Sequence, residues 1–325
     1  MKNKVLALLK EQSEYISGED ISNKLGITRA GVWKNINKLK QEGYHIEAST
    51  KKGYHLINTP DILTPEELSS IIHTEILGKK ICYYEEVDST NEVAKGLARA
   101  GSKEGTVVIA DKQLVGKGRL GKIWDSPSGT GIWMSIILKP NIMPAQASQL
   151  TLLAGLNMCE AIQRVTGLDC KIKWPNDIVV QGKKVCGILT EMSAEIDRIN
   201  YIILGIGVNV NTKSFGGELS HATSLSVASG KNYVRRYIVK EFLQLFETDY
   251  MRYKDKKSID IFLERYRASC ITLHNDVKII TAEREYKAYV KDIAQDGSLI
   301  VIDEEGAEKS ILSGEISVRG IYDYV

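Results

Sequence analysis

Features that mark secreted, metal-binding or membrane proteins are scarce in this sequence. Its five cysteines are scattered without a CxxC pair, which argues against a disulfide framework or a structural zinc site. The five histidines are equally dispersed, so no metal-ligand cluster is visible. No apolar run approaches the roughly 18 residues that span a bilayer, and the N-terminal segment lacks the cleavage site of a signal peptide. The sequence therefore predicts a cytoplasmic protein with reduced thiols and no membrane partner.

The remaining composition is that of an ordinary globular protein, with 43% hydrophobic and 26% charged residues in a chain of 325. This length exceeds one compact domain, so we expect two or three. The net charge of +2 is unevenly distributed, because residues 1–58 hold ten Lys or Arg against six Asp or Glu and the remainder holds 33 against 35. A basic N-terminal segment on a nearly neutral body favours a polyanion as the partner of that segment.

The N-terminal segment has the pattern of a helix-turn-helix. Apolar residues recur on one face of a predicted helix over residues 2–12. Ser17, with a carboxylate three residues later, predicts the start of a second helix that ends at Gly26. Thr28 then predicts the cap of a third helix that runs to Gly43. Two helices, a tight glycine turn and a polar third helix are typical of DNA-binding heads.

Residues 44–57 predict a β-hairpin with Lys51-Lys52-Gly53 at its tip, which makes the head a winged variant with lysines placed to reach phosphates. The alternative is a small helical interaction domain whose basic residues form a solvated face. On the DNA-binding interpretation the contacting residues come from the third helix and the hairpin tip: Thr28, Arg29, Lys34, Asn35, Lys38, Lys51 and Lys52.

Beyond a proline-containing connector the pattern predicts two more domains. A helix is expected near residues 65–77, and from there to about residue 265 apolar strand-like runs mix with helical periods, as in a mixed α/β domain with its own core. From about Cys270 short alternating strands separated by turn dipeptides predict a small all-β barrel. The expected central strands are Thr106–Ala110, Ile132–Leu138 and Tyr201–Val210, and the expected helices Asn91–Ala100, Ala145–Thr166 and Val234–Asp255.

The most informative stretch is the glycine-rich segment Gly116–Gly131. It matches the dinucleotide pattern GxGxxG and the phosphate-loop pattern GxxxxGK, but both require a helix to start there. Pro127 and further glycines exclude a helix, and Ile123 stands where the phosphate loop needs Ser or Thr, so we reject both. As a plain surface loop it would be unusually rich in tryptophan and isoleucine. We instead expect a loop that orders around a negatively charged, partly apolar ligand through Lys117, Arg119, Lys122 and Trp124.

Two later segments carry further candidate groups. In Lys173-Trp-Pro-Asn-Asp177 the polar residues after the proline either form a turn or face a ligand. Lys184 follows within a hydrophobic strand, where its charge is weakly screened. A long apolar strand then ends in Gly205-Ile-Gly-Val-Asn209-Val-Asn211, whose glycines permit close approach to the backbone. Each of these segments is a weak signal alone.

Taken together, five motifs resemble those of the biotin–protein ligases: Asp88-Ser-Thr-Asn91, GKGRLGKIW, KWPND, GKKVCGIL and GIGVNVN, in this order. Because of its head, the chain is similar to the bifunctional kind, a ligase that is also the biotin operon repressor. The resemblance covers essentially the whole chain and implies an α+β fold in three parts. These are a winged helix-turn-helix over 1–60, a mixed α/β ligase domain of the biotin/lipoate type over 61–268, and an SH3-like β-barrel over 269–325.

The resemblance also implies a two-step reaction. The carboxylate of biotin attacks the α-phosphate of ATP, with Mg²⁺ present, to give biotinyl-5′-AMP and pyrophosphate. A lysine on the biotin carboxyl carrier protein of a biotin-dependent carboxylase then attacks this mixed anhydride. When carrier protein is scarce, the retained adenylate would order the loops and pair two chains, and the homodimer would bind operator DNA through two heads.

Site residues follow from the same resemblance. Lys184, Arg119 and Asp177 would be catalytic, with Asp177 near Mg²⁺. The biotin-binding residues would be Ser89, Thr90, Asn91, Gln113, Lys117, Gly118, Arg119 and Lys184. The nucleotide-binding residues would be Lys122, Trp124, Asn176 and Asn209, with a second loop at Thr212–Thr223.

The chain departs from the family in one motif. The loop of that family usually reads GRGRxGR, whereas Lys117 and Lys122 stand here in place of arginines. Lysine lacks the bidentate fork of arginine, so we expect weaker retention of the adenylate.

Other functions remain open at this point. A lipoate–protein ligase shares the central fold and the adenylation chemistry, although its loop differs and it normally lacks this head. A transcription regulator could use the central domain only to sense biotin or a nucleotide. A structural adaptor built on the barrel leaves the glycine-rich loop unexplained.

Overall fold

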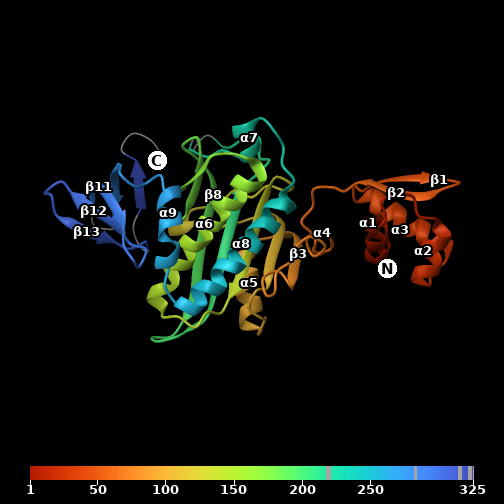
Figure 1. Ribbon diagram of the computed structural model, residues 1–325, viewed down its shortest axis with the longest axis horizontal. Coiled ribbons are helices and arrows are strands. Elements are labelled where there is room, and N and C mark those ends of the chain that lie inside the picture. Colours follow the sequence, from red (N-terminus) through yellow and green to blue (C-terminus); the bar gives the residue numbers. More distant parts are fainter. Residues whose placement is uncertain (217–220, 282–283, 314–316, 321–323, 325) are drawn as a thin grey trace. The chain divides into compact units, whose positions relative to one another are not determined.

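The computed structural model divides into two compact units, Met1–Ile62 and Leu63–Val325 (Figure 1). Within the first unit three helices carry a two-stranded hairpin. The residues that the structure describes are 1–216, 221–281, 284–313, 317–320 and 324. The elements of the first unit are α1 (Lys2–Glu11), α2 (Gly18–Leu25), α3 (Arg29–Gln41), β1 (His45–Ser49) and β2 (Gly53–Asn58).

The helix boundaries of the first unit follow the predicted caps. The Ser17 side chain accepts a hydrogen bond from the Asp20 N–H at 2.9 Å, and Thr28 Oγ1 accepts one from the Gly31 N–H at 3.1 Å. Gly26 ends α2 with a φ of 64°, a left-handed conformation that suits glycine. The predicted helices and hairpin are confirmed. This unit has its own apolar core, which is built from Val5, Leu6, Leu9, Ile16, Ile21, Val32, Ile36, Leu39, Tyr44 and Ile46.

A seven-stranded mixed sheet organises the second unit. Its strand order is β3-β4-β5-β9-β8-β7-β6, and the β3–β4 pair is parallel whereas the other pairs are antiparallel. The strands are β3 (Ile81–Val87), β4 (Val107–Gln113), β5 (Gly131–Leu138), β6 (Cys170–Lys173), β7 (Asp177–Val180), β8 (Lys183–Ala194) and β9 (Ile199–Asn209).

Helices cover the two faces of this sheet unequally. Side chains alternate along a strand, so Val107 and Ile109 enter the large core beneath α6 and α8, whereas Val108 joins a smaller cluster beneath α5. Helices α6 and α8 pack side by side across the first face (Figure 1). The longer helices are α5 (Thr90–Arg99), α6 (Ala147–Thr166) and α8 (Arg235–Lys256), and the shorter ones α4 (Pro65–Leu68), α7 (Leu225–Ser229) and α9 (Leu263–Ser269).

One predicted helix is much shorter than expected. The pattern indicates a helix near 65–77, but α4 ends at Leu68. The carboxylate of Glu247, on α8, accepts hydrogen bonds from the backbone N–H groups of Glu75, Ile76 and Leu77. Because a distant side chain satisfies these donors, the segment does not need a helical turn to do so.

The described C-terminal residues form an antiparallel sheet, which confirms the all-β prediction, while the SH3-like barrel stays a prediction. The sheet has the order β13-β12-β11-β10-β14. Its buried side chains, such as Val277 and Val301, belong to the same core as α6, and Trp174 Nε1 donates to the Gly297 carbonyl at 3.1 Å. The boundary predicted at residue 268 stays a prediction. The strands are β10 (Asp276–Ile280), β11 (Glu285–Ile293), β12 (Leu299–Asp303), β13 (Glu308–Ile311) and β14 (Ser317–Gly320).

None of the helices that the structure describes is both long enough and apolar enough to cross a membrane.

Candidate active site

A cavity of about 980 Å³ opens on the sheet face that α5 covers only in part. Along β9, Ile203 packs beneath α5, and the next positions on the same face are Gly205, Gly207 and Asn209. A Cβ atom at Gly205 would lie 2.2 Å from Asn91 Oδ1, and one at Gly207 would lie 2.5 Å from Trp124 Nε1. The cavity therefore depends on the two glycines predicted to permit close approach.

A row of residues that are paired directly across the strands forms part of its floor. The register places Lys173 opposite Asp177, Asp177 opposite Gly187, and Gly187 opposite Gly207. Trp124 lies over the two glycines, since a Cβ atom at Gly187 would be 2.8 Å from its ring. The row thus runs from an aromatic cover on β9 and β8 to a carboxylate on β7 and an ammonium group on β6.

One end of the cavity is a hydrogen-bonded polar pocket at the start of α5. Gln113 Oε1 accepts from the Thr90 N–H at 2.9 Å, and Gln113 Nε2 donates to Ser126 Oγ at 2.8 Å. Asn91 Oδ1 accepts from Ser135 Oγ at 2.5 Å, and Asn91 Nδ2 donates to Glu191 at 2.7 Å. These bonds hold donors and acceptors in place for a small polar ligand.

A β-bulge points Lys184 into the cavity. Ile178 pairs with Cys186 but Val179 pairs with Lys184, so Val185 is an additional residue in β8. Val185 packs into the core, and Lys184 lies on the same side as Gly187. The Lys184 ammonium group is 2.6 Å from Asp177 Oδ1 and 5.2 Å from the centroid of the Trp124 ring.

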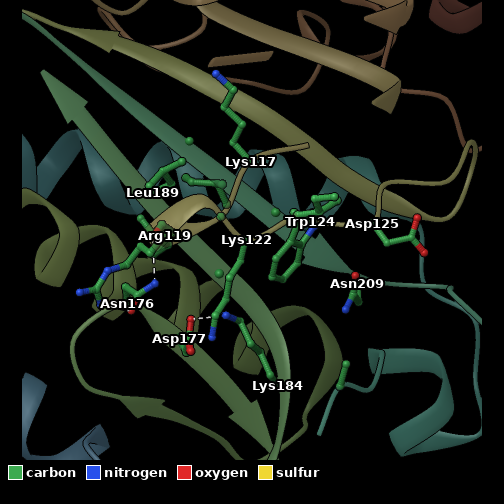
Figure 2. Close-up of a pocket in the computed structure, with 18 of the residues that line it drawn as sticks. Lys117, Arg119, Lys122, Trp124, Asp125, Asn176, Asp177, Lys184, Leu189 and Asn209 are labelled. Carbon is green, nitrogen blue, oxygen red and sulfur yellow. Dashed lines mark hydrogen bonds and ion pairs between the residues drawn. The ribbon is translucent and has the colours of Figure 1, made fainter. Parts of the chain in front are cut away.

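The cations of the glycine-rich loop point in different directions (Figure 2). Arg119 Nη1 donates to Asn176 Oδ1 at 2.9 Å, and its Nη2 donates to the Ser313 carbonyl at 2.6 Å. Lys122 extends toward Asp177. Lys117 turns away and forms an ion pair with Glu92 at 2.6 Å. Lys117 therefore lies at the cavity wall, and its ammonium group is paired with a carboxylate on α5.

The loop conformation agrees with the rejection of both phosphate-loop patterns. Only one 3-10 turn, Arg119–Gly121, interrupts the segment, and Leu120 within it has a φ of 55°. The strand β5 follows at Gly131, with no α-helix between. A phosphate group bound here would thus be held by side chains rather than by a helix N-terminus.

Two of the residues predicted to bind the nucleotide, Asn176 and Asn209, donate side-chain hydrogen bonds to backbone carbonyl groups. Asn176 Nδ2 donates to the Ile188 carbonyl at 3.1 Å, and Asn209 Nδ2 donates to the Thr223 carbonyl at 3.2 Å. The buried Trp124 Nε1 has no hydrogen-bond partner among the residues that the structure describes. Of the predicted second loop, Thr212–Thr223, residues 217–220 lie outside the described residues.

In the first unit, Arg29, Lys34 and Lys38 are exposed on α3, and Lys51 and Lys52 are exposed at the hairpin tip. The Asn35 side chain is different, because its Nδ2 donates to the Gly31 carbonyl at 2.7 Å within the same helix.

Asp177 is one of the two carboxylates among the described residues that line the cavity. Its Oδ2 accepts a hydrogen bond from the Tyr324 hydroxyl, and its Oδ1 faces Lys184. Among the described residues no group of three His, Cys, Asp or Glu side chains could hold a metal ion. Mg²⁺ commonly uses one or two protein carboxylates and takes its other ligands from phosphates and water. The donor set therefore fits Mg²⁺ only together with the phosphates of a nucleotide.

Every residue predicted for this site lines this one cavity, and the structure adds others to which the sequence analysis gave no role. The additions include Lys173, His221, Arg319 and Tyr324. Lys173 belongs to the KWPND motif, so the sequence already pointed to its neighbourhood. Arg319 and Tyr324 come from the far C-terminal segment, and no local pattern connects them with this site.

The cavity is strongly cationic. Among the described lining residues six carry positive charge and two carry carboxylates. Burial lowers the pKa of Lys173 to about 8, and burial together with Lys184 lowers the pKa of His221. The lining therefore suits a ligand with several negative charges. The cations are Lys117, Arg119, Lys122, Lys173, Lys184 and Arg319, and the carboxylates Asp125 and Asp177.

Three family models match the chain: "HTH domain" at residues 2–55, "Biotin/lipoate A/B protein ligase family" at 83–209 and "Biotin protein ligase C terminal domain" at 276–319. The bifunctional ligase/repressor BirA of Bacillus spizizenii is 40% identical over 309 residues, which cover 94% of each chain. The chain belongs to this family of bifunctional ligase/repressors. The Escherichia coli K12 protein of the same name is 28% identical to this chain. The match covers 97% of this chain and 96% of the Escherichia coli protein.

A solved structure also resembles the ligase/repressor. The biotin protein ligase from Aquifex aeolicus in complex with biotin and ATP superimposes with a TM-score of 0.65 at 33% identity. The match covers 74% of the ligase/repressor and 99% of the Aquifex chain. The chain therefore shares its fold beyond the N-terminal unit with an experimentally determined biotin protein ligase.

Proposed function

We propose that the chain is an ATP-dependent biotin–protein ligase that forms biotinyl-5′-AMP, transfers biotin to a lysine of a carrier protein, and represses transcription in response to biotin. One observation carries the proposal. A single cavity joins a polar pocket beside α5 to a cluster of cations around Asp177, in a chain 40% identical to a ligase/repressor. Joining a carboxylic acid to a nucleotide requires such a cavity, because two anionic groups must meet inside it.

In the first step the polar pocket of Thr90, Asn91 and Gln113 would hold the ring end of biotin. The biotin carboxylate attacks the α-phosphate, the bond to the β-phosphate breaks, and its electron pair leaves with pyrophosphate. Lys184 and Arg119 would neutralise the charge that develops, and neither needs to transfer a proton. Because Lys184 is held by Asp177 at 2.6 Å, its ammonium group is oriented before the ligand arrives.

Asp177 would hold Mg²⁺ together with the nucleotide phosphates, and the ion would add further neutralisation of their charge. Trp124, over Gly187 and Gly207, would contact the adenine, with Asn209 on the same side. In the second step the carrier lysine attacks the carboxyl carbon of the mixed anhydride. An amide forms, AMP leaves and the amine loses its proton to solvent. The glycine-rich loop would exclude water from the adenylate meanwhile.

Repression would use the N-terminal unit. Its exposed cations on α3 and at the hairpin tip suit operator DNA, whose phosphates attract lysine and arginine. We propose that two adenylate-bound chains pair, so that two heads contact two half-sites together. The carrier would be the biotin carboxyl carrier protein of a biotin-dependent carboxylase.

The decisive experiment is exchange of labelled pyrophosphate into ATP by the purified chain with Mg²⁺, supplied with biotin or with lipoate. We expect exchange with biotin alone, and a loss of about a hundredfold or more in Lys184→Ala, since such charge stabilisation is worth about that much. Lys183→Ala is the matched control, because Lys183 is the exposed neighbour on the same strand. Exchange with lipoate would make the chain a lipoate ligase. Exchange with neither acid would leave a regulator that only senses its ligand.

A further inference from the structure

Lys173 differs from the paired cations of the cavity. Lys184 forms an ion pair with Asp177, and Lys117 forms one with Glu92. Arg119 donates hydrogen bonds to two carbonyl oxygens. Lys173 is only 5% exposed, and its Nζ forms no hydrogen bond or ion pair with the residues that the structure describes. The group that faces it is the ring of Tyr324, whose centroid is 3.5 Å from Nζ.

An ammonium group on a largely buried side chain without a protein acceptor is unfavourable for folding, because it gives up much of its hydration without a compensating partner. Contact with an aromatic face restores only a small part of that free energy. Positive neighbours add to the penalty, since Lys184, Arg319 and Lys122 all lower the pKa of Lys173 whereas Asp177 raises it. Such an arrangement is favourable once an anion binds in the cavity and contacts the ammonium group.

The position of Lys173 in the sheet indicates which anionic group of a bound ligand would contact its ammonium group. Along the paired row, Gly207 and Gly187 lie beneath Trp124, Asp177 lies one strand further and Lys173 one strand beyond that. Neighbouring strands are about 4.8 Å apart. Lys173 is therefore about 10 Å from the strand that carries Gly187, on the side away from the pocket beside α5. This is the direction in which a leaving group departs when the acid attacks from the α5 side.

We propose that Lys173 binds the pyrophosphate group of the nucleotide and stabilises it as it leaves. The proposal rests on the proposed function of the cavity and adds a residue to it. As the biotin carboxylate oxygen bonds to the α-phosphorus, the bond between that phosphorus and the bridging oxygen breaks. The electron pair stays on pyrophosphate, where the Lys173 ammonium group neutralises it without giving up a proton. In the free protein the Tyr324 ring occupies the place of the anion.

Inorganic pyrophosphate is the probe for the test. Its affinity is measured by calorimetry on the full chain, on Lys173→Met and on Lys173→Arg. Methionine keeps the length of the side chain but removes its charge. We expect binding to weaken about tenfold to a hundredfold in Lys173→Met and to recover in part in Lys173→Arg, as for loss of a charged hydrogen bond. Lys171→Met is the matched control, because Lys171 lies on the same strand outside the cavity and pairs with Asp169.

Two further measurements separate binding from folding. Biotin affinity should be unchanged in Lys173→Met, and its melting temperature should be equal to or above that of the native chain, because an unpartnered buried charge is removed. Unchanged pyrophosphate affinity, or an equal loss for pyrophosphate and biotin, would overturn the proposal. If the native chain binds pyrophosphate through Lys173 but exchanges none into ATP, the ligase function fails while the anion site stands.

Discussion

At the residue scale, the site contains two lysines with different environments. Lys184 and Lys173 lie on either side of Asp177, but only Lys184 forms an ion pair with it. Lys184 keeps a fixed orientation from that pair, whereas Lys173 is buried against an aromatic ring. The same side chain therefore serves as an oriented cation in one place and as an unsatisfied cation in the other. Residue type in the sequence does not distinguish these two environments.

The low pKa of Lys173 predicts a pH-dependent stability. Burial lowers this pKa from 10.5 to about 8, with Asp177 opposing and Lys184, Arg319 and Lys122 adding to the shift. Between pH 8 and 10.5 the unfolded chain therefore binds more protons at this group than the folded chain, so the stability contribution of Lys173 rises with pH. Lys173→Met lacks this contribution, so its stability advantage over the native chain should narrow between pH 7 and 10.

Denaturant unfolding of the two chains across this range measures the effect. The shift in the pKa of Lys173 sets an upper limit of about 3 kcal/mol for the change in this difference in unfolding free energy. A difference that stays constant from pH 7 to 10 would mean that the ammonium group is paired with an anion in the free protein.

At the scale of single elements, β9 separates the two ends of the cavity. Gly205 faces Asn91 in the polar pocket, and Gly207 faces Trp124. Both glycines lie on one face of one strand, two residues apart. Much of this element was predictable, because the long apolar run and its glycines indicate a strand that allows close approach. Which glycine faces which end depends on the strands packed beside it.

Alanine substitutions in β9 should separate the two ligands. A methyl group at Gly205 would lie 2.2 Å from Asn91 Oδ1. Overpacking of this kind costs about 1–3 kcal/mol, so Gly205→Ala should weaken biotin binding by about fivefold to a hundredfold. Gly207→Ala should instead raise the KM for ATP by a similar factor, because its methyl group displaces Trp124. Steady-state kinetics with each substrate varied would measure both effects.

Gly155→Ala is the control for these variants. Gly155 lies within α6, and its new methyl group would have only ordinary contacts at 3.9 Å or more. We expect kinetics within twofold of the native chain and a stability gain of up to about 1 kcal/mol. Equal losses for biotin and ATP in both β9 variants would contradict the assignment of two ends.

At the scale of the whole molecule, the two compact units have separate cores. Val5 and Ile36 belong to the core of Met1–Ile62, whereas the strands of the seven-stranded sheet belong to Leu63–Val325. A core that is complete within one unit does not need the other unit for its burial. The proposed adenylation and DNA-binding functions can therefore be tested apart, each on its own unit.

Removal of residues 1–62 should leave pyrophosphate exchange within about twofold and abolish binding to operator DNA. The full chain should protect the operator in a footprint only when biotin and ATP are both present, and sedimentation under the same conditions should show a dimer. Protection that is equally strong without biotin and ATP would argue against the proposed repression mechanism. Loss of exchange on truncation would mean that the N-terminal unit contributes to the ligase site.

Local sequence determined most of the elements, whereas the predicted site residues followed from the resemblance of five motifs taken together. Three local features depend on interactions within a few residues, so they can be predicted directly from the sequence. They are the helix caps at Ser17 and Thr28, the hairpin with its basic tip, and the absence of a helix in Gly116–Gly131. Tertiary structure alone decided the remainder. The bulge at Val185 turns Lys184 toward Asp177, and packing of the C-terminal segment brings Tyr324 to Asp177 across 147 residues. Such contacts depend on strand register and on the packing of distant segments, which no local pattern encodes.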